Sequence, residues 1–371
     1  MTKKYDIAAY IWPAYTGDEP RTRMFWSEGI GEWQSVKNAE EKIVNGQKYL
    51  WNRKPLWGYV NEADPYVMQM QIEAAVDHGV NVFIYDWYWY DRRPFLENCL
   101  NDGFLKAKNN NKMKFYLMWA NHTVNNTWDI RISGDGDNII WDGAADRKEF
   151  EIICKRVIEK YFKHPSYYKI DNKPVFQIYD LDNLIRGLEG INGTIAAFDW
   201  FRNECVKSGF DGVHLRLTKW GDNPHNLSGV DAGRSMMTAE IFNSLEFDSL
   251  TNYQFVHFVN IDRDYNEIMA DVLKEWEKTD KLYSKPYFPH ISVGWDNNPR
   301  FKDFRHGIVK NNTPENFAAA LEHAKKYADA HPNQPPLITV NSWNEWTETS
   351  YLMPDNVYGY GYLEAVKKVF L

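Results

Sequence analysis

The fold is decided by a helix that leads directly into a buried strand, seen most clearly in residues 64–87, DPYVMQMQIEAAVDHGVNVFIYDW. Asp64 is a good helix cap, Pro65 suits the first helical position, and Gly79 is a typical stop signal. Between them, apolar residues recur at helical spacing and form a stripe suited to packing on a sheet. Val80–Trp87 is then almost continuously apolar or aromatic, as in strands covered on both faces of a parallel sheet. The segment predicts one helix–strand unit of an α/β fold.

The same unit recurs along the whole chain. Strands are predicted at Asp6–Trp12, Val80–Trp87, Lys114–Trp119, Pro174–Tyr179, Gly212–Leu217, Ser249–Phe255, Tyr287–Val293 and Pro336–Ser342. Helical patterns between and after them begin at Asp64 and Thr313 and cover Phe150–Lys160, Ile195–Lys207, Tyr265–Lys278 and Leu363–Phe370. Eight strands alternating with helices, without a linker, predict a single (β/α)8 TIM barrel domain over residues 1–371. The alternative is a doubly wound sheet with an appended domain.

Three long segments follow predicted strands, at Pro13–Ala63, Asn121–Lys148 and Thr218–Asp248. Loops of this length in a compact domain are usually functional. In a barrel all three would gather at the C-terminal mouth, where active sites lie.

The composition is that of an ordinary globular protein, with 44% hydrophobic and 25% charged residues, but 16% of the residues are aromatic. A net charge of −8 argues against a nucleic-acid partner, because phosphates attract basic surfaces. No stretch approaches the ~18 apolar residues of a membrane span, and the first residues lack the apolar run of a secretory signal. We therefore expect a cytoplasmic protein as the sequence is written, or a periplasmic or secreted one if an export segment has been removed.

The densest polar cluster follows the last predicted strand, in residues 339–351, TVNSWNEWTETSY. In a regular strand, residues three apart point to opposite faces, so Glu345 and Glu348 can face one cavity only if the chain turns after Trp343. Two carboxylates beside aromatic rings are what glycosidic cleavage needs: an acid for the leaving oxygen and a base near the anomeric carbon. Apolar surroundings and like charge would raise one pKa and keep that acid protonated. The alternative is a glutamate pair that caps or salt-bridges a loop.

Aromatic and polar residues also gather at the ends of other predicted strands. Residues 85–91, YDWYWYD, hold more aromatic side chains than core packing requires, because a strand buries alternate residues. Asp86 and Asp91 are candidates for binding hydroxyl groups. Tryptophan beside Asn, Asp or His recurs after strands three and seven, and this repetition indicates carbohydrate binding. The predicted sugar contacts are Tyr10, Trp12, Trp87, Trp119, Asn121, Tyr253, Trp295, Asp296 and Asn344.

Other chemistries lack their signatures. The chain has no His-Glu-x-x-His, Cys-x-x-Cys, P-loop, dinucleotide-binding glycine motif or Gly-x-Ser-x-Gly elbow. We therefore expect no metal and no cofactor. Cys99, Cys154 and Cys205 are expected to be small buried thiols.

The motifs resemble those of WbsX-type, glycoside hydrolase family 99-like proteins, which are related to endo-α-mannosidases and occur in bacterial polysaccharide gene clusters. The resemblance runs from Trp26–Trp33 to Tyr351–Pro354 and is most specific in residues 343–348, WNEWTE, which are similar to the family's Trp-Asn-Glu-Trp-x-Glu-Gly. It implies a (β/α)8 barrel that cleaves α-linked sugars with retention. Glu345 would act as base on the sugar's own 2-hydroxyl, giving an anhydro-sugar intermediate. Glu348 would be the general acid and later the base for water.

The sequence departs from the family pattern at several positions. Thr349 stands where the family commonly has glycine, and Met353 where glutamate is common. Residues 119–124, WANHTV, replace Trp-Ala-Asn-Glu-Asn-Trp, so an acidic residue is missing near the expected sugar. These differences argue against mannose specificity and for another glycoside. A glycosyltransferase, for which Asp180-Leu-Asp182 has a metal-site spacing, and a non-catalytic glycan-binding barrel are the alternatives.

Overall fold

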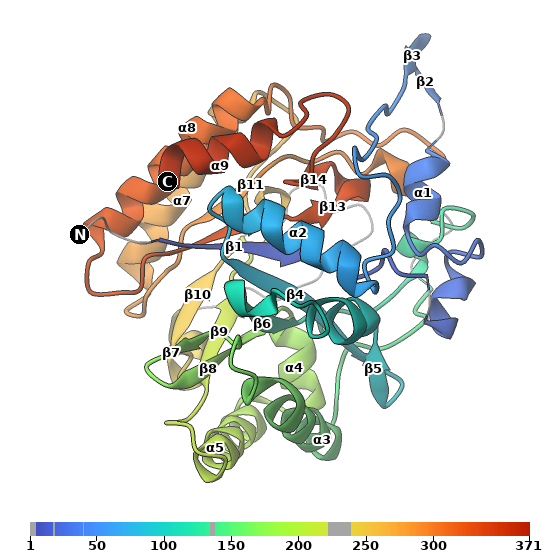
Figure 1. Cartoon of the computed structure of the whole chain (residues 1–371). Helices are drawn as coiled ribbons and strands as arrows, with labels where there is room; N and C mark the ends of the chain where they lie inside the picture. Colours follow the sequence, from blue (N-terminus) through green and yellow to red (C-terminus); the bar gives the residue numbers. More distant parts are fainter. Residues whose placement is uncertain (1–4, 18, 40, 134–137, 222–238) are drawn as a thin grey trace.

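Eight parallel strands form the centre of the molecule in the computed structural model, which describes residues 5–17, 19–39, 41–133, 138–221 and 239–371 (Figure 1). They are β1 (Asp6–Ile11), β4 (Val82–Tyr90), β6 (Lys114–Trp119), β8 (Lys173–Ile178), β9 (His214–Thr218), β10 (Ser249–Thr251), β11 (His290–Ser292) and β12 (Leu337–Asn341). Their order around the sheet is β10-β9-β8-β6-β4-β1-β12-β11. Each of these strands overlaps one of the eight predicted strand ranges.

The two ends of this sheet meet and nearly close it. Leu250 of β10 forms a parallel bridge with Tyr287, just before β11. Leu250 N donates to Pro286 O at 3.0 Å, and Phe288 N donates to Leu250 O at 2.9 Å. The predicted barrel is therefore confirmed, and the doubly wound alternative is wrong.

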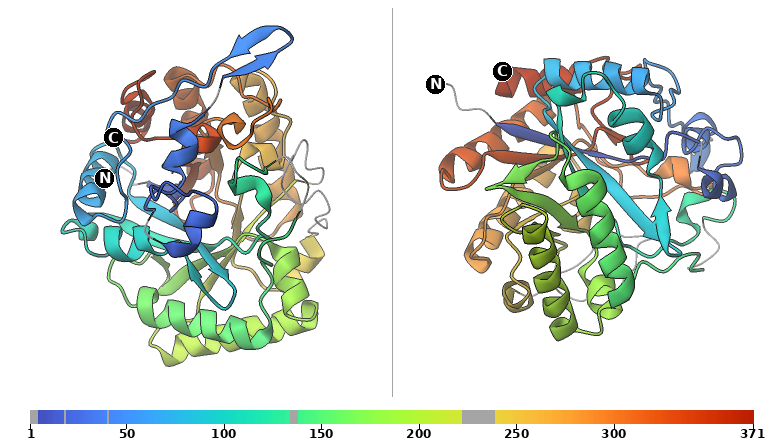
Figure 2. Two further views of the ribbon diagram at one scale, coloured as in Figure 1. Left: turned by 90° about the vertical axis from the view of Figure 1, so that its right-hand side faces the viewer. Right: turned by 60° about the horizontal axis from the view of Figure 1, so that its bottom comes forward.

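Helices cover the outside of the barrel (Figures 1 and 2). They are α1 (Trp33–Lys37), α2 (Pro65–Asp77), α3 (Arg147–Val157), α4 (Leu181–Gly187), α5 (Ile191–Lys207), α6 (Ala239–Ser244), α7 (Tyr265–Leu282), α8 (Pro314–Ala330) and α9 (Gly361–Phe370). Side chains of Asp64, Asp146, Asp264 and Thr313 accept hydrogen bonds from first-turn amides and fix four of the helix starts. The short helices α1, α4 and α6 were not predicted, because they hold too few turns to show a periodic stripe.

The barrel interior contains polar side chains that find partners within it. His290 is fully buried, with its ring nitrogens 3.0 Å from Thr339 Oγ1 and 3.0 Å from Ser292 Oγ. Burial lowers the pKa of His290 to about 3, so the ring is neutral. Arg216 lies on β9 with Nη1 2.7 Å from Tyr116 Oη. These hydrogen bonds explain how apolar strands accommodate a histidine and an arginine in the barrel interior, below the mouth.

Long loops and short strands lie at the C-terminal mouth. The segment after β1 includes α1 and the hairpin of β2 (Lys42–Val44) and β3 (Gln47–Tyr49), which projects from the body (Figure 2). There β5 (Arg93–Phe95) folds back on the end of β4, and β13 (Asn344–Glu345) pairs with β14 (Ser350–Tyr351). At the opposite end of the barrel, β7 (Lys169–Ile170) pairs with the first residues of β8. Of the predicted long segment Thr218–Asp248, residues 222–238 lie outside the described residues. Within the described ranges, no helix has both the length and the apolar character that a membrane crossing requires.

Candidate active site

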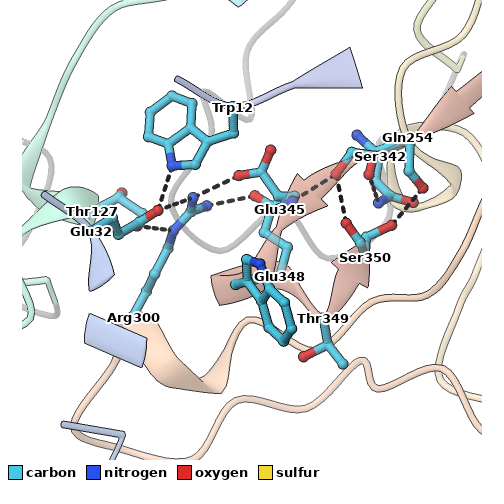
Figure 3. Close-up of polar contacts among 12 residues, drawn as sticks. Trp12, Glu32, Thr127, Gln254, Arg300, Ser342, Glu345, Glu348, Thr349 and Ser350 are labelled. Carbon is cyan, nitrogen blue, oxygen red and sulfur yellow. Dashed lines mark hydrogen bonds and ion pairs between the residues drawn. The ribbon is translucent and has the colours of Figure 1, made fainter. Parts of the chain in front are cut away.

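A short hairpin beyond β12 brings the two predicted carboxylates together. β13 and β14 pair antiparallel, with Glu345 opposite Ser350, and the intervening residues Trp346–Glu348 form a 3-10 turn. A 3-10 helix has three residues per turn, so side chains at i and i+3 lie above one another. Glu345 begins this turn and Glu348 ends it, and their side chains face the same way (Figure 3). The turn that the sequence argument required after Trp343 is therefore present.

Arg300 joins both carboxylates to a third (Figure 3). Its Nη2 lies 2.8 Å from Glu345 Oε1, its Nη1 lies 2.5 Å from Glu348 Oε1, and its Nε lies 2.9 Å from Glu32 Oε1. Glu32 also accepts a 2.5 Å hydrogen bond from Trp12 Nε1. The glutamates are thus salt-bridged, as the structural alternative predicted. However, the arginine lies beside them at a cavity and not in a distant loop.

The cavity at the barrel mouth has an empty volume of about 860 Å³, which includes space that is open to solvent. Glu345, Glu348, Arg300 and Asp86 form its polar part. Six aromatic rings line it: Trp12, Tyr88, His122, Trp128, Tyr179 and Tyr253. The remaining wall comes from Met118, Ala120, Thr123–Asn125, Thr127 and Ile139. A concave site with aromatic walls and a few convergent charged groups is the usual form of a small-molecule or sugar site.

Burial sets the electrostatics of the carboxylate pair. It raises the pKa of Glu345 well above its ordinary value, and the neighbouring Glu348 charge adds to this while Arg300 opposes it. Burial likewise raises the pKa of Glu348, again against the attraction of Arg300. Glu348 Oε2 is buried with no hydrogen-bond partner among the described residues. Both shifts favour retention of a proton by this pair.

Tyr253 connects Glu345 to Asp86 across the cavity wall. Its hydroxyl oxygen lies 2.8 Å from Asp86 Oδ2 and 3.2 Å from Glu345 Oε2. Burial raises the pKa of Asp86 well above its usual range, and the charge of Glu348 raises it further. Asp86 Oδ1 is buried and finds no partner within the described part of the chain. Asp86 is one of the residues that line the cavity, so a ligand hydroxyl that enters it could supply the missing partner.

The structure brings five of the predicted candidates to this cavity: Trp12, Asp86, Tyr253, Glu345 and Glu348. Trp87 and Trp119 are not among the residues that line it. Successive strand residues point to opposite faces. Asp86 and Tyr88 point into the cavity, so Trp87 points outward and donates to Glu97 Oε1 at 2.9 Å.

The same alternation explains Trp119 on β6. Its neighbours Met118 and Ala120 line the cavity, whereas the Trp119 ring lies 6.3 Å from that of Phe150 on α3. Trp87 and Trp119 therefore lie on the face of their strands that is turned away from the cavity.

The other predicted sugar contacts have structural partners and also do not line the cavity. Tyr10 lies inside the barrel, where its hydroxyl accepts from Gln177 Nε2 at 2.9 Å. Asn121 Nδ2 donates to Asp180 O at 2.7 Å. Asp296 accepts from Asn298 Nδ2 at 2.7 Å and from the Tyr49 hydroxyl, and Trp295 is buried. Asn344 holds the backbone of Trp12, accepting from its N at 2.7 Å and donating to its O at 2.9 Å.

Sequence reasoning missed Arg300 and Glu32 as site residues. The order of strands could have indicated them, because β11, β12 and β1 are neighbours in the barrel. The loops after these strands carry Arg300, the glutamate pair and Glu32, and adjacent parallel strands bring their C-terminal loops together.

Thr349 shows why the family commonly has glycine at this position. It adopts the left-handed conformation, with φ 53°, at the end of the 3-10 turn. Glycine enters this region without steric cost, whereas a β-branched residue does not. Here the Thr349 hydroxyl donates to Asp296 O at 2.9 Å and accepts from Trp51 Nε1 at 2.8 Å. These two bonds offset the backbone strain.

Comparison with solved structures defines the class of fold. The GH99 endo-α-mannosidase from Bacteroides thetaiotaomicron superposes with a TM-score of 0.58 at 12% identity, covering 99% of this chain and 97% of that one. A protein described as glycoside hydrolase-like gives a TM-score of 0.60 at 13% identity, over 100% and 94% of the two chains. At such low identity the likeness concerns the fold alone. The chain has the TIM barrel of glycoside hydrolases.

The family follows from the sequence itself. The family model described as "Glycosyltransferase WbsX" matches residues 7–366, and the chain belongs to this family. The predicted family resemblance is thereby confirmed. Curated relatives include the "Uncharacterized protein WxcX" of two strains of Xanthomonas campestris pv. campestris, each 24% identical over 356 residues. The match covers 94% of this chain and 47% of WxcX, so the chain spans about half the length of these relatives.

Proposed function

We propose that the protein is a retaining glycoside hydrolase that acts on α-linked glycans, with Glu345 as the base and Glu348 as general acid and later base. The observation that carries this proposal is the pair of buried carboxylates on one guanidinium, facing an aromatic-lined cavity. The division of roles between them follows the family resemblance.

The charges around the cavity support acid–base chemistry. One guanidinium contacts the carboxylates of Glu32, Glu345 and the partly exposed Glu348, so the acids outnumber the cation, and the raised pKa values of Glu345 and Glu348 favour their protonated forms. Glu348 lines the cavity, and in its protonated form it can donate to a glycosidic oxygen there. Both glutamates share the Arg300 cation, so the choice of Glu345 as the base that accepts a proton from a sugar hydroxyl follows the family resemblance.

The aromatic walls support a sugar ligand. Trp12, Tyr88 and Trp128 form a contiguous group, with ring centroids 5.3 to 5.9 Å apart. Flat apolar faces cover the C–H faces of a pyranose, while the carboxylates accept from its hydroxyls. Glycosyl transfer from a nucleotide-sugar has less support, because Asp180 caps α4 by accepting from Asn183 N at 3.0 Å. The Asp180-Leu-Asp182 spacing is therefore explained by a helix cap.

Incubation with a library of α-linked glycans and bacterial polysaccharide fragments tests the proposal. We expect a glycan to be shortened, as detected by mass spectrometry, with the initial product having the anomeric configuration of the substrate by NMR. Inversion would contradict the retaining mechanism. Turnover of a nucleotide-sugar with no glycan hydrolysed would contradict the hydrolase and favour transfer.

Trp128 and Trp87 give a paired prediction for substrate binding. Trp128→Phe removes part of a cavity wall and is expected to raise KM by up to roughly tenfold, since an aromatic contact contributes about 0.5–1.5 kcal/mol. Trp87→Phe removes the hydrogen bond to Glu97 and should lower the unfolding free energy by about 1–3 kcal/mol. Its KM should stay at the wild-type value. Steady-state kinetics and thermal denaturation of both variants separate the two effects, and a raised KM in Trp87→Phe would contradict the assignment.

A further inference from the structure

A single phenolic hydroxyl lies between two carboxylates in the wall of the cavity. The Tyr253 oxygen is 2.8 Å from Asp86 Oδ2 and 3.2 Å from Glu345 Oε2. A phenol has one proton to donate. If both acids were ionised, one of the two contacts would bring a lone pair against a negative oxygen in a buried site. Both contacts are favourable only if one of the acids carries a proton and donates it to the phenol.

The surrounding charges decide which acid carries that proton. Arg300 Nη2 lies 2.8 Å from Glu345 Oε1, so a cation stabilises the ionised form of Glu345. No arginine or lysine among the described residues forms an ion pair with Asp86. The groups that act on Asp86 are the phenol of Tyr253, which favours its charge, and the carboxylate of Glu348, which opposes it.

Two further tyrosines lie close enough to Asp86 for its charge to affect their pKa values. Tyr88 follows it on β4, and Tyr10 lies on the neighbouring strand β1. The pKa values of both phenols are raised well above the ordinary value by burial, so both are neutral and offer Asp86 no compensating charge. Among the described residues, the groups that act on this carboxyl therefore include no cation.

We propose that Asp86 is protonated in the free protein and acts as a positioning residue, donating through Tyr253 to keep Glu345 ionised as the base. Asp86 Oδ2–H donates to the Tyr253 oxygen, and Tyr253 O–H donates to Glu345 Oε2. Asp86 Oδ1 then faces the cavity as a carbonyl oxygen and accepts from a sugar hydroxyl. The catalytic part of this inference rests on the proposed function, whereas the proton on Asp86 does not.

Infrared spectroscopy of the free protein tests the proton directly. Aspartate labelled with carbon-13 at the side-chain carboxyl shifts the carbonyl stretch of any neutral aspartic acid. We expect such a shifted band at neutral pH, and its loss in Asp86→Asn. Asp142→Asn is the matched control, because Arg186 holds the pKa of Asp142 below its usual range and its removal should leave the band unchanged. Absence of the band in the wild type, or its persistence in Asp86→Asn, would overturn the proposal.

Kinetics then test the positioning role. An amide can donate to Tyr253 as a neutral acid does, whereas a methyl group cannot. Asp86→Ala is therefore expected to lower kcat by roughly tenfold or more, and Asp86→Asn should recover a substantial part of that loss. The pH profile of Asp86→Asn should also lack one ionisation on its basic limb. Equal impairment of the two variants, or an unchanged pH profile in Asp86→Asn, would contradict the role. If no glycan is hydrolysed by the wild type, the infrared result still decides the proton assignment.

Discussion

Replacing Glu345 or Glu348 by glutamine should each lower kcat/KM by roughly 10²–10⁴-fold on an active glycan, the range expected when a general acid or base is removed. The amide keeps the size of the side chain and its contact with Arg300 but neither takes up nor releases a proton at neutral pH. Because each change places an uncharged amide in a cluster where carboxyl groups outnumber the one guanidinium, we expect the melting temperature to be unchanged or higher. Loss of function with gain of stability would mark these residues as catalytic and not structural.

The control for this pair is Glu364→Gln on α9. Glu364 has 61% side-chain exposure and lies outside the cavity. It should retain wild-type kinetics and melting temperature. Full activity in both cavity variants would remove the assignment, and a large fall in their melting temperatures would point to the salt bridges as the main role of the glutamates.

The largest effect on stability is expected from Arg300→Met. It leaves three carboxylates, those of Glu32, Glu345 and Glu348, without their cation. Removing one partner of a buried ion pair costs about 3–5 kcal/mol, mainly because the remaining charge stays buried. We expect a fall of this order in the unfolding free energy, seen as a much lower melting temperature.

This loss should depend on pH in a definite direction. Burial raises the pKa values of Glu345 and Glu348 above those of the unfolded chain, and loss of Arg300 raises them further. Such groups favour the folded state below their unfolded pKa, about 4.3, and lose that contribution as pH rises through the folded value. The gap between variant and wild type should therefore be smallest in mild acid and widest above neutrality.

Arg186→Met provides the comparison. Arg186 pairs with Asp142 at the surface, where the two side chains are 54% and 53% exposed. Surface pairs contribute about 0–1 kcal/mol, because solvent screens them and both side chains lose entropy. If Arg300→Met were no less stable than Arg186→Met, or if its deficit did not change with pH, the buried cluster would not hold the charges inferred for it.

The fold was predictable because its signals are local. Each buried strand is a short apolar run, and helices such as α2 and α8 carry caps and proline at their starts. Strand ends were less certain: the predicted strand Ser249–Phe255 stops at Thr251, where the chain leaves the sheet before Tyr253 reaches the cavity. The turn after Thr251 has no periodic sequence pattern from which the end of the strand could be predicted.

The site was predictable only in part, for a different reason. Glu345 and Glu348 stand in one contiguous motif, so the sequence alone joins them. The choice between Asp86 and Trp87 depends on which face of β4 looks inward, and an aromatic side chain fits either face. Arg300 is remote in sequence from its partners, and no pattern in the chain links it to Glu32 before the strand order is known.

The cavity wall around Trp12 and the wall opposite to it are held by different kinds of contacts. On one side, Asn344 bonds to the backbone of Trp12 and Glu32 to its indole, and Arg300 joins that glutamate to the turn of Glu345 and Glu348. A change at any of these positions would disturb the others. The opposite wall, around residues 123–128 and Ile139, meets this cluster through the Trp128 ring, whose centroid lies 5.3 Å from that of Trp12. Apolar ring packing tolerates substitution better than a buried ion-pair network does, so divergence toward new sugars, in evolution or in the laboratory, should accumulate on this second wall while the first stays fixed.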